Sequence, residues 1–254
     1  MSHFYVGVVV KKQARGECIE AEVARLLAPF DEKLDVTPYK KYEKPARMAE
    51  YYQMDPSDWE GLAKRMKDWT GCEGGVDGEG LFYWSTYNPE SKWDWYRIGG
   101  RWDGVIRGID RPSKDDGFNF GDEHQRLIHN VVEVNALLPF IGPEIDDAAR
   151  EKIRLKWDTE LARMEGKYGP PENENDIQFH MGSKEPDYDR HPDDRTPRAL
   201  VYSLNGEPTW VEKGRMGWFG VSVGDIEHRD WANRVKAVLA DFPDHLVVGV
   251  DCHI

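Results

Sequence analysis

The stretch FYVGVVV, residues 4–10, decides the fold, because its β-branched residues are typical of a buried strand, here with a glycine at its centre. The segment CIEAEVARLLAPF follows, and its apolar residues have the spacing i, i+4, i+7 and i+8 of one helix face: Ile19, Val23, Leu26 and Leu27. Pro29 ends this predicted helix. The stretch LDVTPYKKY, residues 34–42, then indicates a second strand.

The C-terminal end of the chain repeats this layout. GWFGVSV, residues 217–223, indicates a strand that again has a central glycine. A helix is predicted after it, with Asp225 as its N-cap. Its apolar face shows the same four spacings: Trp231, Val235, Val238 and Leu239. HLVVGVDCHI, residues 245–254, indicates the last strand.

Two strand–helix–strand units predict an α+β fold with a ferredoxin-like split βαβ antiparallel sheet built from the two chain ends. The first and third strands would lie side by side, and their central glycines would mark a close approach of the two backbones. The alternative is two unrelated packing units of similar layout. We expect residues 1–42 and 200–254 to form the core, and residues 43–199 to form an inserted subdomain.

The insertion has two compositional features. Six of the ten tryptophans of the chain lie between residues 59 and 102, which predicts a Trp-rich subdomain. Residues 172–197 contain eight acidic and three basic residues and few apolar ones, which predicts an irregular, mobile acidic segment.

The formal net charge of −13 argues against bulk nucleic-acid binding, because phosphate contacts require a basic surface. It permits a small anionic ligand held by a few arginines, or a basic protein partner. Three cysteines without a CxxC pair indicate reduced thiols and therefore a cytoplasmic protein. The apolar run at the N-terminus is too short for a signal peptide or a membrane span, so we expect no membrane association.

The stretch NPESKWDWYRIGGRWDG, residues 88–104, is the densest patch of aromatic and charged residues. Strand alternation would place Trp93, Trp95 and Arg97 on one side. A Gly-Gly turn could present backbone N–H groups, and arginine and indole groups suit a planar anion such as a nucleotide. The predicted ligand-binding residues are Arg97, Gly99, Gly100, Arg101 and Trp102. The alternative is a Trp-rich core, since tryptophans and stacked arginines also serve packing.

Four stretches resemble a family of hypothetical proteins from bacteriophages and bacteria: YNPESKWDWYRIGGRWDG, LLAPFDE, KGRMGWFG and VDCHI. The resemblance spans most of the chain. It implies an origin in a phage or another mobile element, and thus the host cytoplasm as the location. It implies no mechanism and no catalytic residues.

In the last strand, Val248, Val250, Cys252 and Ile254 alternate with Val247, Gly249, Asp251 and His253. We expect the wholly apolar set to face both helices. Asp251 and His253 would then share the opposite face and would be buried if the insertion covers it. His253, paired with Asp251, is the candidate general acid or base. The alternative is a structural hydrogen bond or a solvated chain end.

No metal site is predicted. His180, Asp187, Asp189 and His191 could ligate a metal, but their spacing matches no recognised site. The sequence names no cofactor, and no catalytic signature decides whether the chain is an enzyme. We therefore expect a phage or mobile-element accessory protein that binds, or acts on, a small anionic or nucleotide-like ligand. The alternatives are an acidic inhibitor of a basic host protein and a structural protein without a ligand.

Overall fold

The computed structural model describes residues 2–12, 16–109, 123–181, 185–186, 188, 190–217 and 221–254. The chain forms two compact units. Unit 1 consists of Met1–Ala28 and Trp93–Ile254, and unit 2 consists of Pro29–Lys92. The chain therefore divides after residues 28 and 92, whereas the sequence suggested divisions after 42 and 199.

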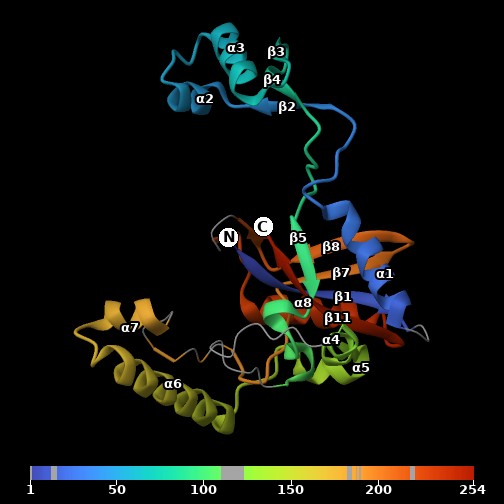
Figure 1. Cartoon of the computed structure of the whole chain (residues 1–254), viewed down its shortest axis with the longest axis vertical. Helices are drawn as coiled ribbons and strands as arrows, with labels where there is room; N and C mark the ends of the chain where they lie inside the picture. The colour runs from blue at the N-terminus through green and yellow to red at the C-terminus, as the bar shows by residue number, and fades with distance from the viewer. Residues whose placement is uncertain are drawn as a thin grey trace. The chain divides into compact units, whose positions relative to one another are not determined.

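Unit 1 is built on a mixed β-sheet (Figure 1). Its main path runs in the order β5 (Trp95–Ile98), β11 (His245–His253), β1 (His3–Lys11), β7 (Ala199–Leu204) and β8 (Glu207–Glu212). A further short strand, β6 (Val131–Glu133), also pairs with β11. β1 and β7 are parallel, and the other pairs of this sheet are antiparallel. The predicted α+β class is confirmed.

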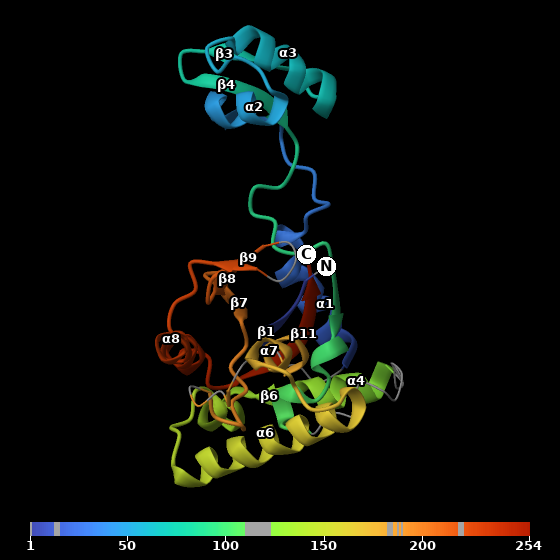
Figure 2. The same cartoon turned by 90° about the vertical axis from the view of Figure 1, so that its left-hand side faces the viewer.

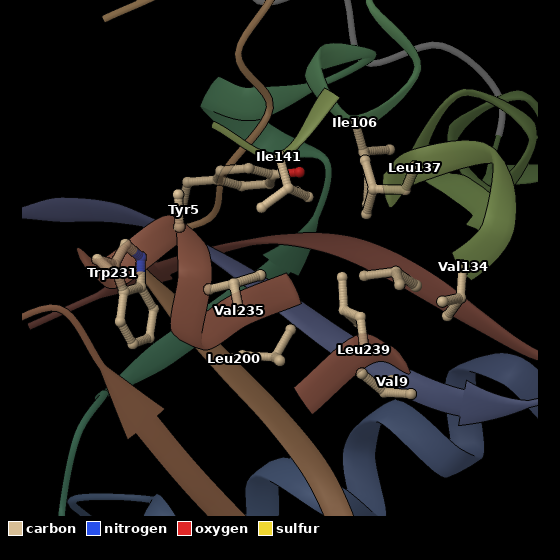
Figure 3. Packing of buried hydrophobic residues seen from close by; sticks show 12 residues of the cluster. Tyr5, Val9, Ile106, Val134, Leu137, Ile141, Leu200, Trp231, Val235 and Leu239 are labelled. Carbon is tan, nitrogen blue, oxygen red and sulfur yellow. The ribbon is translucent and has the colours of Figure 1, made fainter. Parts of the chain in front are cut away.

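Each face of the central strands carries a helix. On α8 (His228–Ala240), Trp231, Val235 and Leu239 are buried in one cluster with Tyr5 and Val9 of β1 and with Leu200 and Val247 (Figure 3). Val6, Val8 and Val10 alternate with these β1 residues and are buried on the other face. That face is covered by α1 (Gly16–Leu27), which lies on the opposite side of the sheet from α8 (Figure 2).

The ferredoxin-like arrangement is not confirmed. The stretch 34–42 contributes only to β2 (Tyr39–Glu43), which lies in the sheet of unit 2. Of the stretch 217–223, residues 218–220 lie outside the described residues, and β10 (Ser222–Val223) pairs with β9 (Arg215–Met216). β7 occupies the place beside β1.

The close backbone approach at Gly7 involves the last strand instead of the predicted third strand. Gly7 lies opposite Gly249 in the pairing of β1 with β11. A Cβ atom at Gly7 would lie 3.1 Å from Leu200 Cδ1 and 3.2 Å from Val247 Cγ1. The missing side chain therefore makes room for core residues of neighbouring strands.

The remaining elements of unit 1 connect and flank this sheet. They are the short 3-10 helices η2 (Gly100–Trp102), η3 (Val105–Arg107) and η5 (Leu138–Phe140), and the helices α4 (Glu123–Asn130), α5 (Val134–Leu137), α6 (Asp147–Tyr168) and α7 (Glu174–Met181). In the predicted mobile segment 172–197, α7 is helical, and Asp194 and Thr196 are buried. Residues 182–184, 187 and 189 of that segment lie outside the described residues.

Unit 2 has a three-stranded antiparallel sheet in the order β2, β4 (Gly80–Ser85), β3 (Gly74–Asp77). Its core joins this sheet to α2 (Pro45–Tyr52) and α3 (Trp59–Thr70) through Ala49, Leu62, Ala63, Met66 and Leu81. Asp58 caps α3 by accepting a hydrogen bond from the Gly61 N–H. Trp59 and Trp84 are exposed, so these two do not build the Trp-rich core that composition suggested.

Within the described ranges, none of the helices has both the length and the apolar character needed to cross a membrane.

Candidate functional site

The pairing of three strands brings the candidate residues together at one end of the sheet. Opposite residues of antiparallel strands share a face. Asp251 of β11 lies opposite Arg97 on β5 and Tyr5 on β1. His253 lies opposite Trp95 on β5 and His3 on β1. The terminal-strand cluster is defined as six residues, in which Asp94 is included because its carboxylate contacts His253: His3, Asp94, Trp95, Arg97, Asp251 and His253.

The carboxylate of Asp251 is buried and fully engaged. The residue is 1% exposed. Its Oδ1 lies 3.0 Å from Nδ1 of His3, and its Oδ2 accepts a hydrogen bond of 2.9 Å from the backbone N–H of Arg101. Asp251 therefore orients one imidazole and fixes the turn that follows β5.

His253 is 5% exposed and has a different carboxylate partner. Its Nδ1 lies 2.6 Å from Oδ1 of Asp94. The Asp94 backbone N–H also donates a hydrogen bond of 3.0 Å to the His253 carbonyl oxygen. Asp94 thus contacts His253 through both its main chain and its side chain.

The predicted pairing of Asp251 with His253 is wrong, although both residues belong to the same cluster. Residues i and i+2 on one strand face are separated by roughly 6.5 Å along the strand. Directly opposite residues on neighbouring strands have Cβ atoms about 4.5–5.5 Å apart. Asp251 therefore reaches an imidazole on a neighbouring strand. Sequence reasoning missed His3 and Asp94, because the register of distant strands is needed to find them.

The predicted facing of the last strand is also wrong. The apolar set of β11 does not face both helices, since α8 packs on the face that carries Val247, Asp251 and His253. The helices α1 and α8 cover opposite faces of the sheet. The expected burial of Asp251 and His253 is found, and the residues that pack against them come from the N-terminus and from the stretch 94–101.

Aromatic rings complete the cluster. Trp95 stacks on the imidazole of His253, with ring centroids 5.2 Å apart and an interplanar angle of 16°. The His3 ring meets both edge-on, with its centroid 5.2 Å from that of Trp95 and 5.0 Å from that of His253. Trp95 is 40% exposed, so part of its indole faces solvent. The cluster therefore combines the buried His253 and the partly buried His3 with an accessible aromatic surface.

Trp93 does not share the side of Trp95, contrary to the predicted alternation. It is buried, and its Nε1 donates a hydrogen bond of 3.1 Å to the Leu27 carbonyl oxygen of α1. Its ring contacts Tyr96, which lies opposite Cys252. Regular alternation begins only at Trp95, where β5 starts.

The Gly-Gly turn is packed against side chains of unit 1. Gly99 and Gly100 have φ angles of 75° and 55°, which favour glycine. A Cβ atom at Gly100 would lie 2.5 Å from Asp251 Oδ2, and one at Gly99 would lie 2.5 Å from Asn130 Nδ2. The backbone N–H presented after the turn, that of Arg101, donates to Asp251. Gly100 therefore leaves room for Asp251, and Gly99 leaves room for Asn130.

The two residues that follow the glycines, Arg101 and Trp102, differ in burial. Trp102 packs on the core cluster and lies 5.8 Å from Tyr5 between ring centroids. The Arg101 side chain is exposed. Of the five predicted ligand residues, Arg97 belongs to the terminal-strand cluster, and it is half-buried beside Trp95 on β5.

Tyr5 lies opposite Asp251, so its buried phenol is on the same sheet face as Arg97 and Asp251. Burial raises the pKa of Tyr5 far above its ordinary value; Asp194 adds to this shift and Arg195 opposes it. Its hydroxyl has no hydrogen-bond partner among the described residues. The phenol therefore stays protonated at neutral pH.

The structure offers no sign of a metal centre in the part of the chain that it describes: no group of three or more His, Cys, Asp or Glu side chains is placed to hold an ion. His180 stacks on Tyr168, with ring centroids 4.4 Å apart, and His191 Nδ1 accepts a hydrogen bond from the Asp193 backbone N–H. Asp187 and Asp189 lie outside the described residues.

The chain was compared with protein families, curated proteins and solved structures, and none of the three comparisons found a match. The resemblance to phage and bacterial proteins therefore stays a prediction. The site must be interpreted from its own chemistry.

Proposed function

We propose that the terminal-strand cluster binds a small anionic ligand with a planar ring, of the nucleotide type. The observation that carries this proposal is the position of Trp95. This residue is 40% exposed, contacts both histidines and lies on the same face of β5 as Arg97. A planar ring and an anionic group attached to it would find complementary partners within one strand length.

Each part of the cluster has a defined chemical task in this proposal. The exposed indole of Trp95 stacks on the base, an interaction worth about 1–3 kcal/mol per base. Arg97 contacts the phosphate, because a guanidinium has five N–H donors and can serve an anion while it also contacts the protein. His3 and His253 supply further N–H donors when protonated.

The origin and the location of the protein are proposed from the sequence. From the resemblance, we propose a phage or mobile-element accessory protein, and from the cysteine pattern we propose the host cytoplasm as its location. The alternative of an acidic inhibitor that binds a basic host protein rests on the net charge of −13 alone. That charge is no obstacle to a small anion, since a few local donors are sufficient to bind it.

Calorimetric titration with a panel of nucleoside monophosphates tests the proposal. Trp95→Ala should weaken binding about 5- to 150-fold, which corresponds to the loss of about 1–3 kcal/mol of stacking. Trp84→Ala is the matched control, because Trp84 is 43% exposed on a strand of the other unit. Arg97→Gln should also weaken binding, whereas Arg101→Ala should have a smaller effect because Arg101 follows β5 and is not part of the terminal-strand cluster.

Two results would overturn the proposal. One is the absence of binding across the whole panel. The other is an equal loss of affinity in Trp95→Ala and Trp84→Ala, which would mean that any exposed indole contributes the same.

A further inference from the structure

The terminal-strand cluster contains two separate carboxylate–imidazole pairs. Asp251 lies 3.0 Å from His3 Nδ1, and Asp94 lies 2.6 Å from His253 Nδ1. The two imidazole centroids are 5.0 Å apart. The four residues come from three distant segments of the chain, and strand pairing brings these segments together.

In each pair the carboxylate contacts Nδ1 of its own histidine. This contact determines the protonation state of Nε2, the other ring nitrogen. An ionised carboxylate only accepts hydrogen bonds, so Nδ1 must carry the proton in each pair. Nε2 is then a proton acceptor when the imidazole is neutral, and a proton donor when it is charged. The carboxylate also fixes the tautomer and the orientation of the ring, as in the serine hydrolase triad.

A single histidine paired with a carboxylate often serves only to make a structural hydrogen bond. Here two lie in ring contact, beside an exposed indole and on the same sheet face as Arg97. A base and an acid that serve one reaction must both reach the reacting group within hydrogen-bonding distance. The two imidazole centroids are 5.0 Å apart, so both rings lie in the same small part of the cluster.

We propose that His3 and His253 form an acid–base pair that cleaves a phosphodiester bearing a neighbouring hydroxyl group, a reaction class that rests on the proposed function. The neutral histidine takes the proton of the hydroxyl, whose oxygen forms a new bond to phosphorus. The bond from phosphorus to the leaving oxygen breaks, and the protonated histidine donates its proton to that oxygen. The products are a cyclic phosphate and an alcohol, and no co-reactant is consumed.

Other groups of the cluster support this step. Arg97 neutralises the charge on the non-bridging phosphate oxygens, which increases in the transition state. Asp94 and Asp251 are positioning residues, because they act through the imidazoles. Among the described residues, the charged and titratable groups on the same sheet face as the two histidines include Arg97 from β5, Asp251 from β11 and Tyr5 from β1, and Asp94 contacts His253 from the residue before β5; Cys252 points to the other sheet face.

The full-length chain is incubated with the dinucleoside monophosphate uridylyl-3′,5′-adenosine and, in parallel, with its 2′-deoxy counterpart. The expected products are uridine 2′,3′-cyclic phosphate and adenosine, and the deoxy compound should remain intact because it lacks the attacking hydroxyl. The rate should show a bell-shaped dependence on pH, as a base and an acid are both required. These readouts need no variant and therefore do not depend on the folding of one.

The variants His3→Gln and His253→Gln should each lower the rate roughly 100-fold or more. His245→Gln is the matched control, since His245 lies at the other end of β11 and should leave the rate unchanged. Asp94→Asn and Asp251→Asn should lower the rate and displace one limb of the pH profile, a change that lost stability alone would not produce.

Binding of adenosine monophosphate, measured on the same preparation, separates the two proposals. Binding without cleavage of the ribose dinucleotide would overturn the acid–base pair and leave the proposed function standing. The absence of both would overturn both. Cleavage that survives His3→Gln and His253→Gln, or that also consumes the deoxy compound, would contradict the acid–base pair.

Discussion

Asp194 is a buried carboxylate that ties three segments of unit 1 together. Its Oδ1 accepts hydrogen bonds of 2.9 Å from the Gly142 N–H and 2.5 Å from the Thr196 hydroxyl. Its Oδ2 lies 2.9 Å from Arg190 Nε and 3.0 Å from His228 Nε2. The acidic composition of residues 172–197 predicted a mobile segment, but this acidic residue is an anchor for the chain before α6 and for the start of α8.

Replacing Asp194 should destabilise the protein in a pH-dependent manner. Burial raises the pKa of Asp194, but the close contact with His228, the hydrogen bond from Thr196 and the charge of Arg190 outweigh it, so the pKa lies well below its ordinary value. The stabilisation is then present above the unfolded pKa of about 3.9 and is lost as the pH falls toward the folded pKa. Asp194→Asn should cost roughly 3 kcal/mol of unfolding free energy at pH 7.

Urea unfolding at pH 7 and at pH 3 measures this difference. Asp193→Asn is the control, because Asp193 is largely exposed in its ion pair with Lys152 and should contribute less than about 1 kcal/mol. A cost for Asp194→Asn that is the same at both pH values would contradict the account.

At the scale of elements, the turn after β5 is the part that positions the site. Gly100 combines a φ of 55° with a Cβ position 2.5 Å from Asp251 Oδ2. Gly100→Ala should therefore cost about 1–3 kcal/mol of stability and displace Asp251 from the Arg101 N–H. Gly224→Ala separates the two effects, since Gly224 has a φ of 72° but nothing within 4 Å of its Cβ position. Equal thermal unfolding shifts in the two variants would show that the contact with Asp251 is unimportant.

Local elements could be predicted from the sequence because their signals are local. The β-branched apolar runs FYVGVVV and HLVVGVDCHI predict β1 and β11, and the spacing of Trp231, Val235 and Leu239 predicts α8. Strand pairing could not be predicted, because it depends on contacts between distant segments. The strand at 34–42 has the right residues, yet it pairs with β4 of unit 2.

The residues of the candidate site could likewise be predicted only in part. Arg97, Asp251 and His253 could be found because unusual charged and aromatic residues interrupt apolar strands. Their partners could not, since His3 lies 248 residues from Asp251 and only the register of β1 with β11 makes them neighbours. The Gly-Gly turn was predicted to present backbone N–H groups to a ligand, but the group that accepts from the Arg101 N–H and lies against Gly100 is the carboxylate of Asp251.

At the scale of the whole molecule, the cluster belongs entirely to unit 1. It uses both ends of the chain and the stretch that begins where unit 2 ends, so its formation reports the complete folding of unit 1. The acidic composition of the chain is distributed over both units, and the proposed ligand is bound by local groups of the cluster.

The most direct test is a nitrogen-resolved NMR spectrum of the histidine and tryptophan side chains, recorded before and after addition of adenosine monophosphate. Nδ1 of His3 and of His253 should carry a proton in the free protein. The nucleotide should shift both Nε2 resonances and the Trp95 indole N–H, while His245 and Trp84 should stay unchanged. A proton on Nε2 alone in the free protein, or shifts confined to residues outside the terminal-strand cluster, would contradict it.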